Sequence, residues 1–250
     1  SWNWKAGTSF SNDASSTGIG TIDTAGSVST DAGFSIITWT GNATSSQSVA
    51  HGLGAVPKVI FTKNTDNGSQ PWKCYFETVG NGDYLQLNTT DTPATSGVWS
   101  STTPTSSIIS ISNDTGINGS GNTILAYCFA EKQGYSKFGS YTGNGNVDGI
   151  FIYLGFKPAF VILKRTNTSN NWIMFDNKRD PHNEAITVLY PNTSDVEDAG
   201  TGANDLDFVA NGIKIREDNG ECNGSGDSYI YMAFAENPFV TSTGVPTCAR

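Results

Sequence analysis

The stretch PKVIFTK at residues 57–63 decides the fold, because it returns as PAFVILK at residues 158–164. In both stretches a proline comes before a run of apolar residues, which is typical of a buried β-strand that follows a turn. Two such strands, about a hundred residues apart, indicate a chain built from two copies of one domain.

Further motifs recur around these strands in the same order. The pairs are WTGN at 39–42 with YTGN at 141–144, NGSG at 118–121 with NGSG at 223–226, and FAE at 129–131 with FAE at 234–236. Asn and Gly adopt positive φ angles at low steric cost, so we interpret these motifs as turns. A phosphate-binding loop would need a following helix, and the sequence predicts none.

We therefore predict an all-β protein with two tandem, homologous β-sandwich-like domains of jelly-roll type, at residues 33–133 and 134–239. Charged residues make up only 15% of the chain, and abundant Gly, Ser, Thr and Asn favour short strands joined by turns. Residues 1–32 have no sustained apolar pattern and are expected to form an extended arm or linker. Residues 240–250 are expected to form an irregular tail.

The charge balance excludes several classes of partner. The formal net charge of −9 repels nucleic acid and anionic membrane surfaces, and no Lys/Arg cluster offsets it. No apolar stretch approaches the roughly 20 residues that a membrane-spanning helix needs, and the start does not resemble a signal peptide. We expect neither nucleic-acid binding nor membrane insertion.

The four cysteines do not form a metal or redox motif. Cys74 and Cys128 lie in strand-like runs and are expected to be buried free thiols. Cys222 and Cys248 lie among Gly, Asn and Pro, where a disulfide is an open alternative under oxidising conditions.

Five motifs in order resemble a family of tandem-repeat domains in marine bacteriophage virion proteins, which are often called tail-fibre-like. They are GFSIITWTGN from Gly33, HGLGAVPKVIFTKN from His51, GYSKFGSYTGN from Gly134, GFKPAFVILKRT from Gly155 and YIYMAFAENPF from Tyr229. The resemblance covers nearly the whole chain. It implies a component of a phage particle, and it supplies no catalytic residues and no known ligand.

The densest charged segment is the one candidate for acid–base chemistry. It runs from Asp176 through Arg179, Asp180 and His182 to Glu184. Enzymes that cut polysaccharides use paired carboxylates about 5 to 10 Å apart. A solvated loop with local ion pairs is the alternative that we favour, because no other motif builds a site around this segment.

Aromatic side chains give a second set of binding candidates. Trp99 lies in a polar stretch without a counterpart in the other repeat, so we select it as the candidate surface anchor for a ligand, while an irregular core position is the alternative that we favour. Tyr190 is a weaker candidate of the same kind. Trp72 and Trp172 occupy matching positions and are expected to share a core role.

Metal and cofactor sites have little support. The turns at residues 144–149 and 218–224 offer oxygen ligands that suit calcium, but they lack the spacing and closing Glu of a calcium loop. We predict no cofactor, with calcium left as an alternative. His51, beside the turn formed by Gly52–Gly54, is expected to stabilise that turn.

These features predict a non-enzymatic structural protein at the virion surface, assembled in the host cytoplasm, as a fibre segment or a capsid or tail decoration subunit. We expect a homo-oligomer, preferably a trimer, that contacts other virion proteins. Trp2 and Trp4 could dock on a neighbouring subunit or pack on their own domain. The alternatives are an adhesin that binds a host-surface glycan or protein and, with less support, a depolymerase of envelope polysaccharide.

Overall fold

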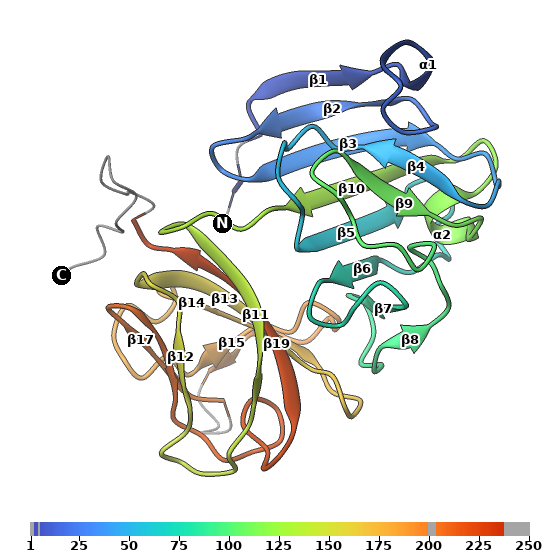
Figure 1. Cartoon of the computed structure of the whole chain (residues 1–250). Helices are drawn as coiled ribbons and strands as arrows, with labels where there is room; N and C mark the ends of the chain where they lie inside the picture. Colours follow the sequence, from blue (N-terminus) through green and yellow to red (C-terminus); the bar gives the residue numbers. More distant parts are fainter. Residues whose placement is uncertain (1–2, 5, 200–203, 238–250) are drawn as a thin grey trace. The chain divides into compact units, whose positions relative to one another are not determined.

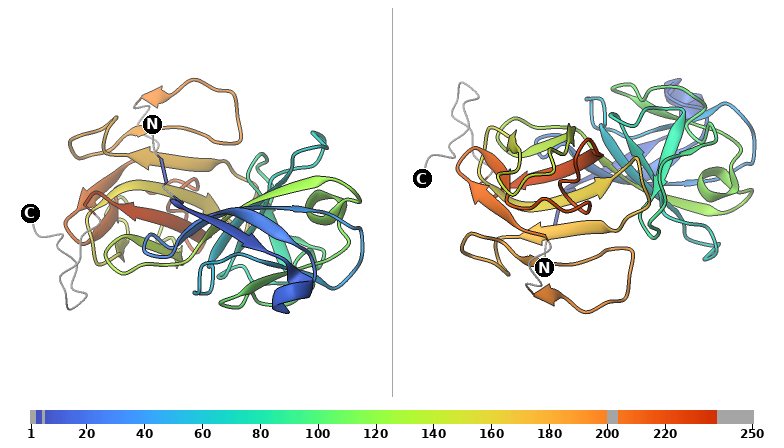
Figure 2. Two further views of the ribbon diagram at one scale, coloured as in Figure 1. Left: turned by 90° about the horizontal axis from the view of Figure 1, so that it is seen from above. Right: turned by 90° about the horizontal axis from the view of Figure 1, so that it is seen from below.

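The computed structural model describes residues 3–4, 6–199 and 204–237, and the chain is mostly β-structure. Strands account for 41% and helices for 3%, in agreement with the expected all-β class. The two helices, α1 (Ala14–Thr17) and α2 (Thr115–Asn118), are single turns, and the views in Figure 2 otherwise show strands and loops. The chain divides into unit 1, Ser1–Leu87 with Pro93–Glu131, and unit 2, Asn88–Thr92 with Lys132–Arg250.

Unit 1 is built on an antiparallel sheet with the order β1-β2-β3-β10-β5-β6-β7-β8 (Figure 1). Its strands are β1 (Thr8–Asn12), β2 (Thr24–Ser29), β3 (Phe34–Thr40), β5 (Val59–Asn64), β6 (Lys73–Phe76), β7 (Asp83–Gln86), β8 (Ala94–Thr95) and β10 (Thr123–Phe129). A second sheet pairs β4 (Gln47–Ala50) with β9 (Ile108–Ile111). Side chains from both sheets, such as Ile37 and Ile109, belong to one buried core.

Unit 2 has a main antiparallel sheet with the order β11-β19-β13-β14, a sheet β12-β18-β17 and the pair β15-β16. Its strands are β11 (Ser136–Thr142), β12 (Phe151–Tyr153), β13 (Pro158–Arg165), β14 (Trp172–Asp176), β15 (Thr187–Val188), β16 (Asp198–Ala199), β17 (Leu206–Val209), β18 (Gly212–Ile215) and β19 (Ser228–Ala235). The core again joins side chains of two sheets, such as Ile213 and Val161. The Asn88–Thr92 segment belongs to this unit because Thr90 accepts a hydrogen bond from Lys164 Nζ at 3.2 Å.

The sequence repeat is also a structural repeat, because corresponding strands pair in the same order and register. The order β3-β10-β5-β6 in unit 1 corresponds to β11-β19-β13-β14 in unit 2. The corresponding residue pairs are Thr40↔Thr123 with Thr142↔Ser228, Asn64↔Ile124 with Arg165↔Tyr229, and Val59↔Phe76 with Phe160↔Asp176. Register fixes which side chains face the core, so both units follow one plan.

A buried asparagine explains why the turn motifs recur. In unit 1 the Asn118 side chain accepts from the Asn42 amide at 2.9 Å and donates to the carbonyls of Thr44 and Ser112, each at 2.9 Å. The TGN turn and the NGSG turn are thereby joined. Gly41 is required at this junction, because a Cβ there would lie 2.3 Å from the Gly119 oxygen.

The same junction occurs in unit 2. Asn223 accepts from the Asn144 amide at 3.0 Å and donates to the carbonyls of Asn146 and Glu217 at 2.9 and 2.6 Å. Both asparagine side chains are fully buried, and a buried amide must find hydrogen-bond partners. The recurring motifs are therefore complementary halves of one contact as well as turns.

The expected arm over residues 1–32 is wrong for most of its length. Strands β1 and β2 instead extend the main sheet beyond β3, with Ala25 opposite Thr38. Their side chains are only partly buried, which is why the sequence shows no sustained apolar alternation. Gly26 permits the close pairing, since a Cβ there would lie 1.9 Å from the Ile36 oxygen.

Three cysteines are buried free thiols. This confirms the expectation for Cys74 and Cys128, and burial raises the pKa of Cys128 to about 12. Cys222 is also free, because it lies in the core of unit 2, and Cys248 lies outside the described residues. Of the two matching tryptophans, Trp172 is fully buried, whereas Trp72 is half-buried and stacks on Tyr127.

His51 stabilises its turn, as expected. Its Nδ1 accepts from the Leu53 amide at 3.3 Å and its Nε2 lies 3.1 Å from the Thr105 oxygen, so the neutral ring carries its proton on Nε2. Burial lowers the pKa of His51 to about 4.

We predict that replacing either buried asparagine, by Asn118→Ala or Asn223→Ala, lowers the free energy of unfolding by about 2–4 kcal/mol, because three backbone groups lose their partner. Urea denaturation of the whole chain measures the loss, and hydrogen exchange assigns it to unit 1 or unit 2. The exposed Asn211→Ala is the matched control. A loss no larger than that of the control contradicts the role of the junction.

We also predict that His51 titrates near pH 4. The unfolded imidazole binds a proton near pH 6.5 and the folded one only near pH 4. The contribution of the neutral His51 to the free energy of unfolding is therefore fully present above pH 6.5 and is lost as the pH falls toward 4. It amounts to about 3 kcal/mol. With two histidines in the chain, NMR titration of wild type and His182→Gln identifies the His51 signal. A midpoint near the unfolded value contradicts the prediction.

Candidate functional site

The charged segment predicted for acid–base chemistry forms the loop between β14 and β15 of unit 2. Asp176 Oδ1 accepts from the amides of Lys178 and Arg179 at 2.9 and 3.0 Å, and its Oδ2 binds Arg179 Nε at 2.7 Å. Burial favours the neutral acid, but these hydrogen bonds and the Arg179 charge outweigh it and lower the pKa of Asp176. Asp176 is thus an ionised cap of its own loop.

Asp180 holds the other end of the loop. Its Oδ2 accepts from the amides of Ile186 and Thr187 at 3.0 and 2.6 Å, while its Oδ1 accepts from the Thr187 hydroxyl at 2.9 Å. Both oxygens therefore bind the start of β15. Glu184 and His182 are exposed on the same loop. The carboxylates of both aspartates therefore have structural partners within the loop and at the start of β15.

A shallow pocket of about 230 Å³ adjoins this loop. Its lining consists of Lys157, Asn177, Asp180, Pro181, His182, Asn183 and Phe208. The pocket brings together two predicted residues, Asp180 and His182, and adds Lys157, which sequence reasoning missed because it lies before β13. Lys157 is paired with Glu236 at 2.9 Å.

The polar side chains that line the pocket are largely engaged in contacts of the fold. Asn177 is buried and donates to Glu236 at 2.9 Å, while its Oδ1 has no hydrogen-bond partner among the described residues. Pockets for drug-sized ligands measure about 300–1,000 Å³, so this one is small for them.

The prediction of Trp99 as a surface anchor is wrong. Trp99 is fully buried in the core of unit 1, edge-on to Tyr75 with 5.8 Å between ring centres. The polar residues around it in sequence are exposed on the loop, whereas the ring points inward. The apolar segment is only two residues long, Val98-Trp99, so it has no periodicity that could have predicted its direction.

Tyr190 is half-buried against the core of unit 2 and is not a free anchor. Its hydroxyl lies 3.4 Å from Glu221 Oε2 and 3.3 Å from Asn204 Nδ2. Burial and the charge of Glu221 raise the pKa of Tyr190 to about 12. The hydroxyl therefore stays protonated as part of a structural network.

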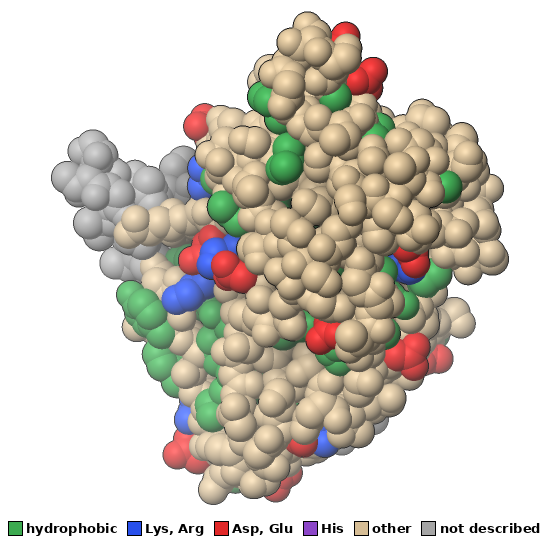
Figure 3. Space-filling view, turned by 45° about the vertical axis from the view of Figure 1, so that its right-hand side comes forward, with side chains coloured by type: hydrophobic (Ala, Val, Ile, Leu, Met, Phe, Trp, Pro, Cys, Tyr) green, Lys and Arg blue, Asp and Glu red, His purple; other side chains and the backbone are tan. Residues whose placement is uncertain are grey.

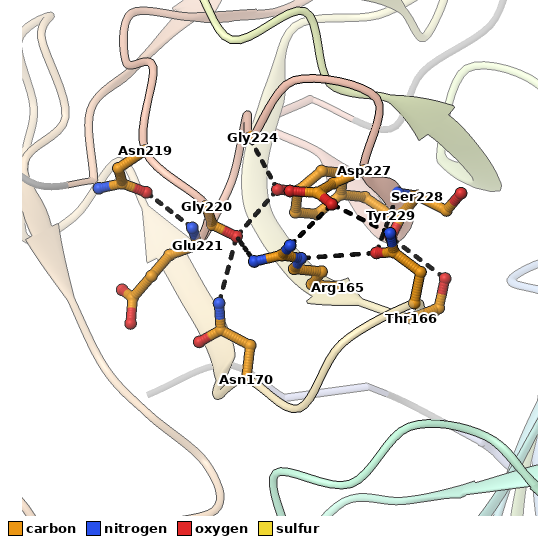
Figure 4. A network of polar contacts seen from close by, with 11 residues as sticks. Arg165, Thr166, Asn170, Asn219, Gly220, Glu221, Gly224, Asp227, Ser228 and Tyr229 are labelled. Atoms are coloured by element: carbon orange, nitrogen blue, oxygen red, sulfur yellow. Dashed lines mark hydrogen bonds and ion pairs between the residues drawn. The ribbon is translucent and has the colours of Figure 1, made fainter.

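The two turns considered for calcium are also tied to the fold. Figure 4 shows the second, in which the Gly220 oxygen accepts from Arg165 at 3.2 Å, Asn170 at 3.2 Å and Tyr229 at 2.9 Å. Arg165 is further paired with Asp227 at 2.7 Å. Within residues 3–4, 6–199 and 204–237, no group of three or more His, Cys, Asp or Glu side chains is arranged to hold a metal.

The tryptophans predicted for subunit contacts are described only in part. Trp4 lies edge-on to Phe129 of its own unit, with ring centres 6.1 Å apart, which fits the alternative of packing on its own domain. Trp2 lies outside the described residues. Neither of the described helices is long and apolar enough to cross a membrane.

Sequence reasoning missed a pair of exposed aromatic side chains in the described part of unit 2. Phe151 and Tyr153, on β12, are 48% and 60% exposed, while Ile152 between them is buried. On the face shown in Figure 3 most of the surface is backbone or side chains that are neither charged nor hydrophobic. The only sequence pattern at residues 151–153 is a short strand-like alternation, and such a pattern does not show which face of the strand the rest of the protein covers.

Comparison with known proteins places the chain in one family. Residues 1–238 match the domain of unknown function DUF7483. No curated protein and no solved structure is similar enough to count as a match. Because the match extends through both units, the chain belongs to the DUF7483 family.

Proposed function

We propose that this chain is a non-enzymatic structural and attachment protein of a bacteriophage particle, displayed at the virion surface after assembly in the host cytoplasm. The observation that supports the non-enzymatic part is the use of Asp176 and Asp180, two of the three candidate carboxylates, as loop caps. The resemblance of the repeat motifs to marine phage virion proteins supports the particle assignment.

The repeated architecture suits a spacer or a decoration subunit. We propose that each unit is a β-sandwich of jelly-roll type, because its core lies among side chains of its main sheet and its smaller sheet. Each copy is a packed β-structure of its own that can serve as an element of a fibre or be attached to a capsid or tail. Exposed edges or the region around Trp4 would contact other virion proteins.

A second function, attachment to a host-surface glycan or protein, is favoured by one observation. Phe151 and Tyr153 expose aromatic surface on unit 2, and aromatic residues are enriched where proteins bind sugars or partners. A virion fibre can carry out both roles. A depolymerase is the weakest candidate, since two of the three carboxylates of its proposed site, Asp176 and Asp180, have structural partners and only Glu184 is left for catalysis.

We predict that the whole chain forms a homotrimer. Light scattering coupled to size-exclusion chromatography should give three times the mass of one chain, and a mass of one chain at all concentrations contradicts a trimeric virion subunit. Deleting residues 1–32 is not a suitable control, because it removes β1 and β2 from the sheet of unit 1.

We further predict that the protein releases no reducing ends from bacterial envelope polysaccharide. Wild type and the double variant His182→Gln/Glu184→Gln should give equal backgrounds in a reducing-sugar assay. Both side chains are exposed, so the variant is expected to fold normally. Release by wild type that falls in the variant would establish the depolymerase.

A further inference from the structure

The outer face of β12 presents two aromatic rings side by side. Phe151 and Tyr153 are two residues apart on one strand, so their side chains leave the same face of the sheet. Ile152, 7% exposed, points to the core instead. Contiguous large apolar side chains that are exposed to solvent often mark an interaction site. Phe151 and Tyr153 form such a contiguous pair.

Unit 1 shows that the fold does not need these rings. The pair Val49↔Ile109 in unit 1 corresponds to Ile152↔Ile213 in unit 2. Ser48 and Ala50 therefore occupy the positions of Phe151 and Tyr153. A strand that folds with a serine and an alanine in one copy carries two exposed aromatics in the other.

The two copies also differ at the free edge of this strand. In unit 1 the amides of Thr21 and Ile22 donate to the Ser48 oxygen at 2.8 and 3.2 Å, so the lead-in segment covers the edge. In unit 2, β12 is the end strand of its sheet, and among the described residues no further backbone segment pairs with it; the Lys137 side chain alone reaches its Tyr153 backbone oxygen. The aromatic face thus lies at an open edge.

The charges around the aromatic face are unusual for an acidic chain. Lys137 Nζ donates to the backbone oxygen of Tyr153 at 3.0 Å and lies 5.2 Å from the centre of the Tyr153 ring. Among the described residues no carboxylate pairs with Lys137.

The other two cations of this face are neutralised by carboxylates. Lys214 is paired with Asp148 at 2.7 Å, and Arg216 with Asp207 at 2.6 Å. Three cations against two carboxylates leave one uncompensated positive charge, on a chain whose net charge is −9.

We propose that this face of unit 2 binds an anionic polysaccharide. The apolar side of a sugar ring lies on Phe151 and Tyr153, and a carboxylate or sulfate of the same glycan lies at Lys137. The Tyr153 hydroxyl and the paired charges offer hydrogen bonds to sugar hydroxyls. This inference rests on the attachment role proposed above and specifies its ligand.

The test is calorimetric titration of the whole protein with three oligosaccharides of equal length. The probes are alginate oligomers, which carry carboxylates, carrageenan oligomers, which carry sulfates, and neutral laminarin oligomers. We expect binding of at least one anionic probe, weaker binding at high salt, and little binding of laminarin.

The variant Phe151→Ser/Tyr153→Ala gives β12 the residues of β4, so the fold is expected to be kept. It should weaken binding about tenfold or more, as loss of ring contacts worth about 1.4 kcal/mol predicts. Lys137→Met should remove the preference for anionic over neutral probes. Val196→Ser, at a residue 86% exposed elsewhere in unit 2, is the matched control and should bind as wild type does.

Three results would overturn the inference: no binding of any probe, equal binding of laminarin, or binding that the double variant leaves unchanged. A dimer that the double variant abolishes would also overturn it, because a second copy would then be the occupant. These outcomes are separate from failure of the virion proposal, which is judged by the trimer mass and the reducing-end assay.

Discussion

A buried asparagine amide joins two loops in each unit, 76 residues apart in unit 1 and 79 in unit 2, and a buried amide of this kind must keep its hydrogen-bond partners. Asn118 and Asn223 each satisfy three backbone groups, and a glycine lets the two turns approach. The turns close the ends of the first and last strands of each repeat. Those strands pair with each other, so the junction also fixes their register.

Because the junction is the same in both units, a neighbouring side chain can differ between them and still make the corresponding hydrogen bond. Trp39 Nε1 donates to the Ile117 oxygen at 3.1 Å, and in unit 2 the Tyr141 hydroxyl donates to the Cys222 oxygen at 2.7 Å. The Cys222 thiol takes the core position of an isoleucine side chain. Cys222 is for this reason a buried free thiol, although its neighbours in the sequence are polar.

The surface differs between the units where the junction has no influence. In unit 1 the lead-in strands extend the main sheet, and the segment around Ile22 covers β4. In unit 2 the corresponding strand, β12, keeps an open edge with two aromatic rings. The charged loop from Asp176 to His182, although rich in titratable groups, uses its aspartates to hold its own backbone. Binding chemistry is therefore better placed at β12 than at that loop.

The sequence by itself determined the β class, the repeat and the identity of the corresponding strands. Apolar runs and turn motifs are local patterns, so they can be recognised without knowing which strand pairs with which. It also placed His51 in a turn and Cys74 and Cys128 in strands. Only the tertiary structure decided the direction of Trp99, the pairing of β1 and β2 with β3, and the exposure of Phe151 and Tyr153. Each of these depends on which segment covers a given face or edge, and that is set by contacts between residues far apart in the chain.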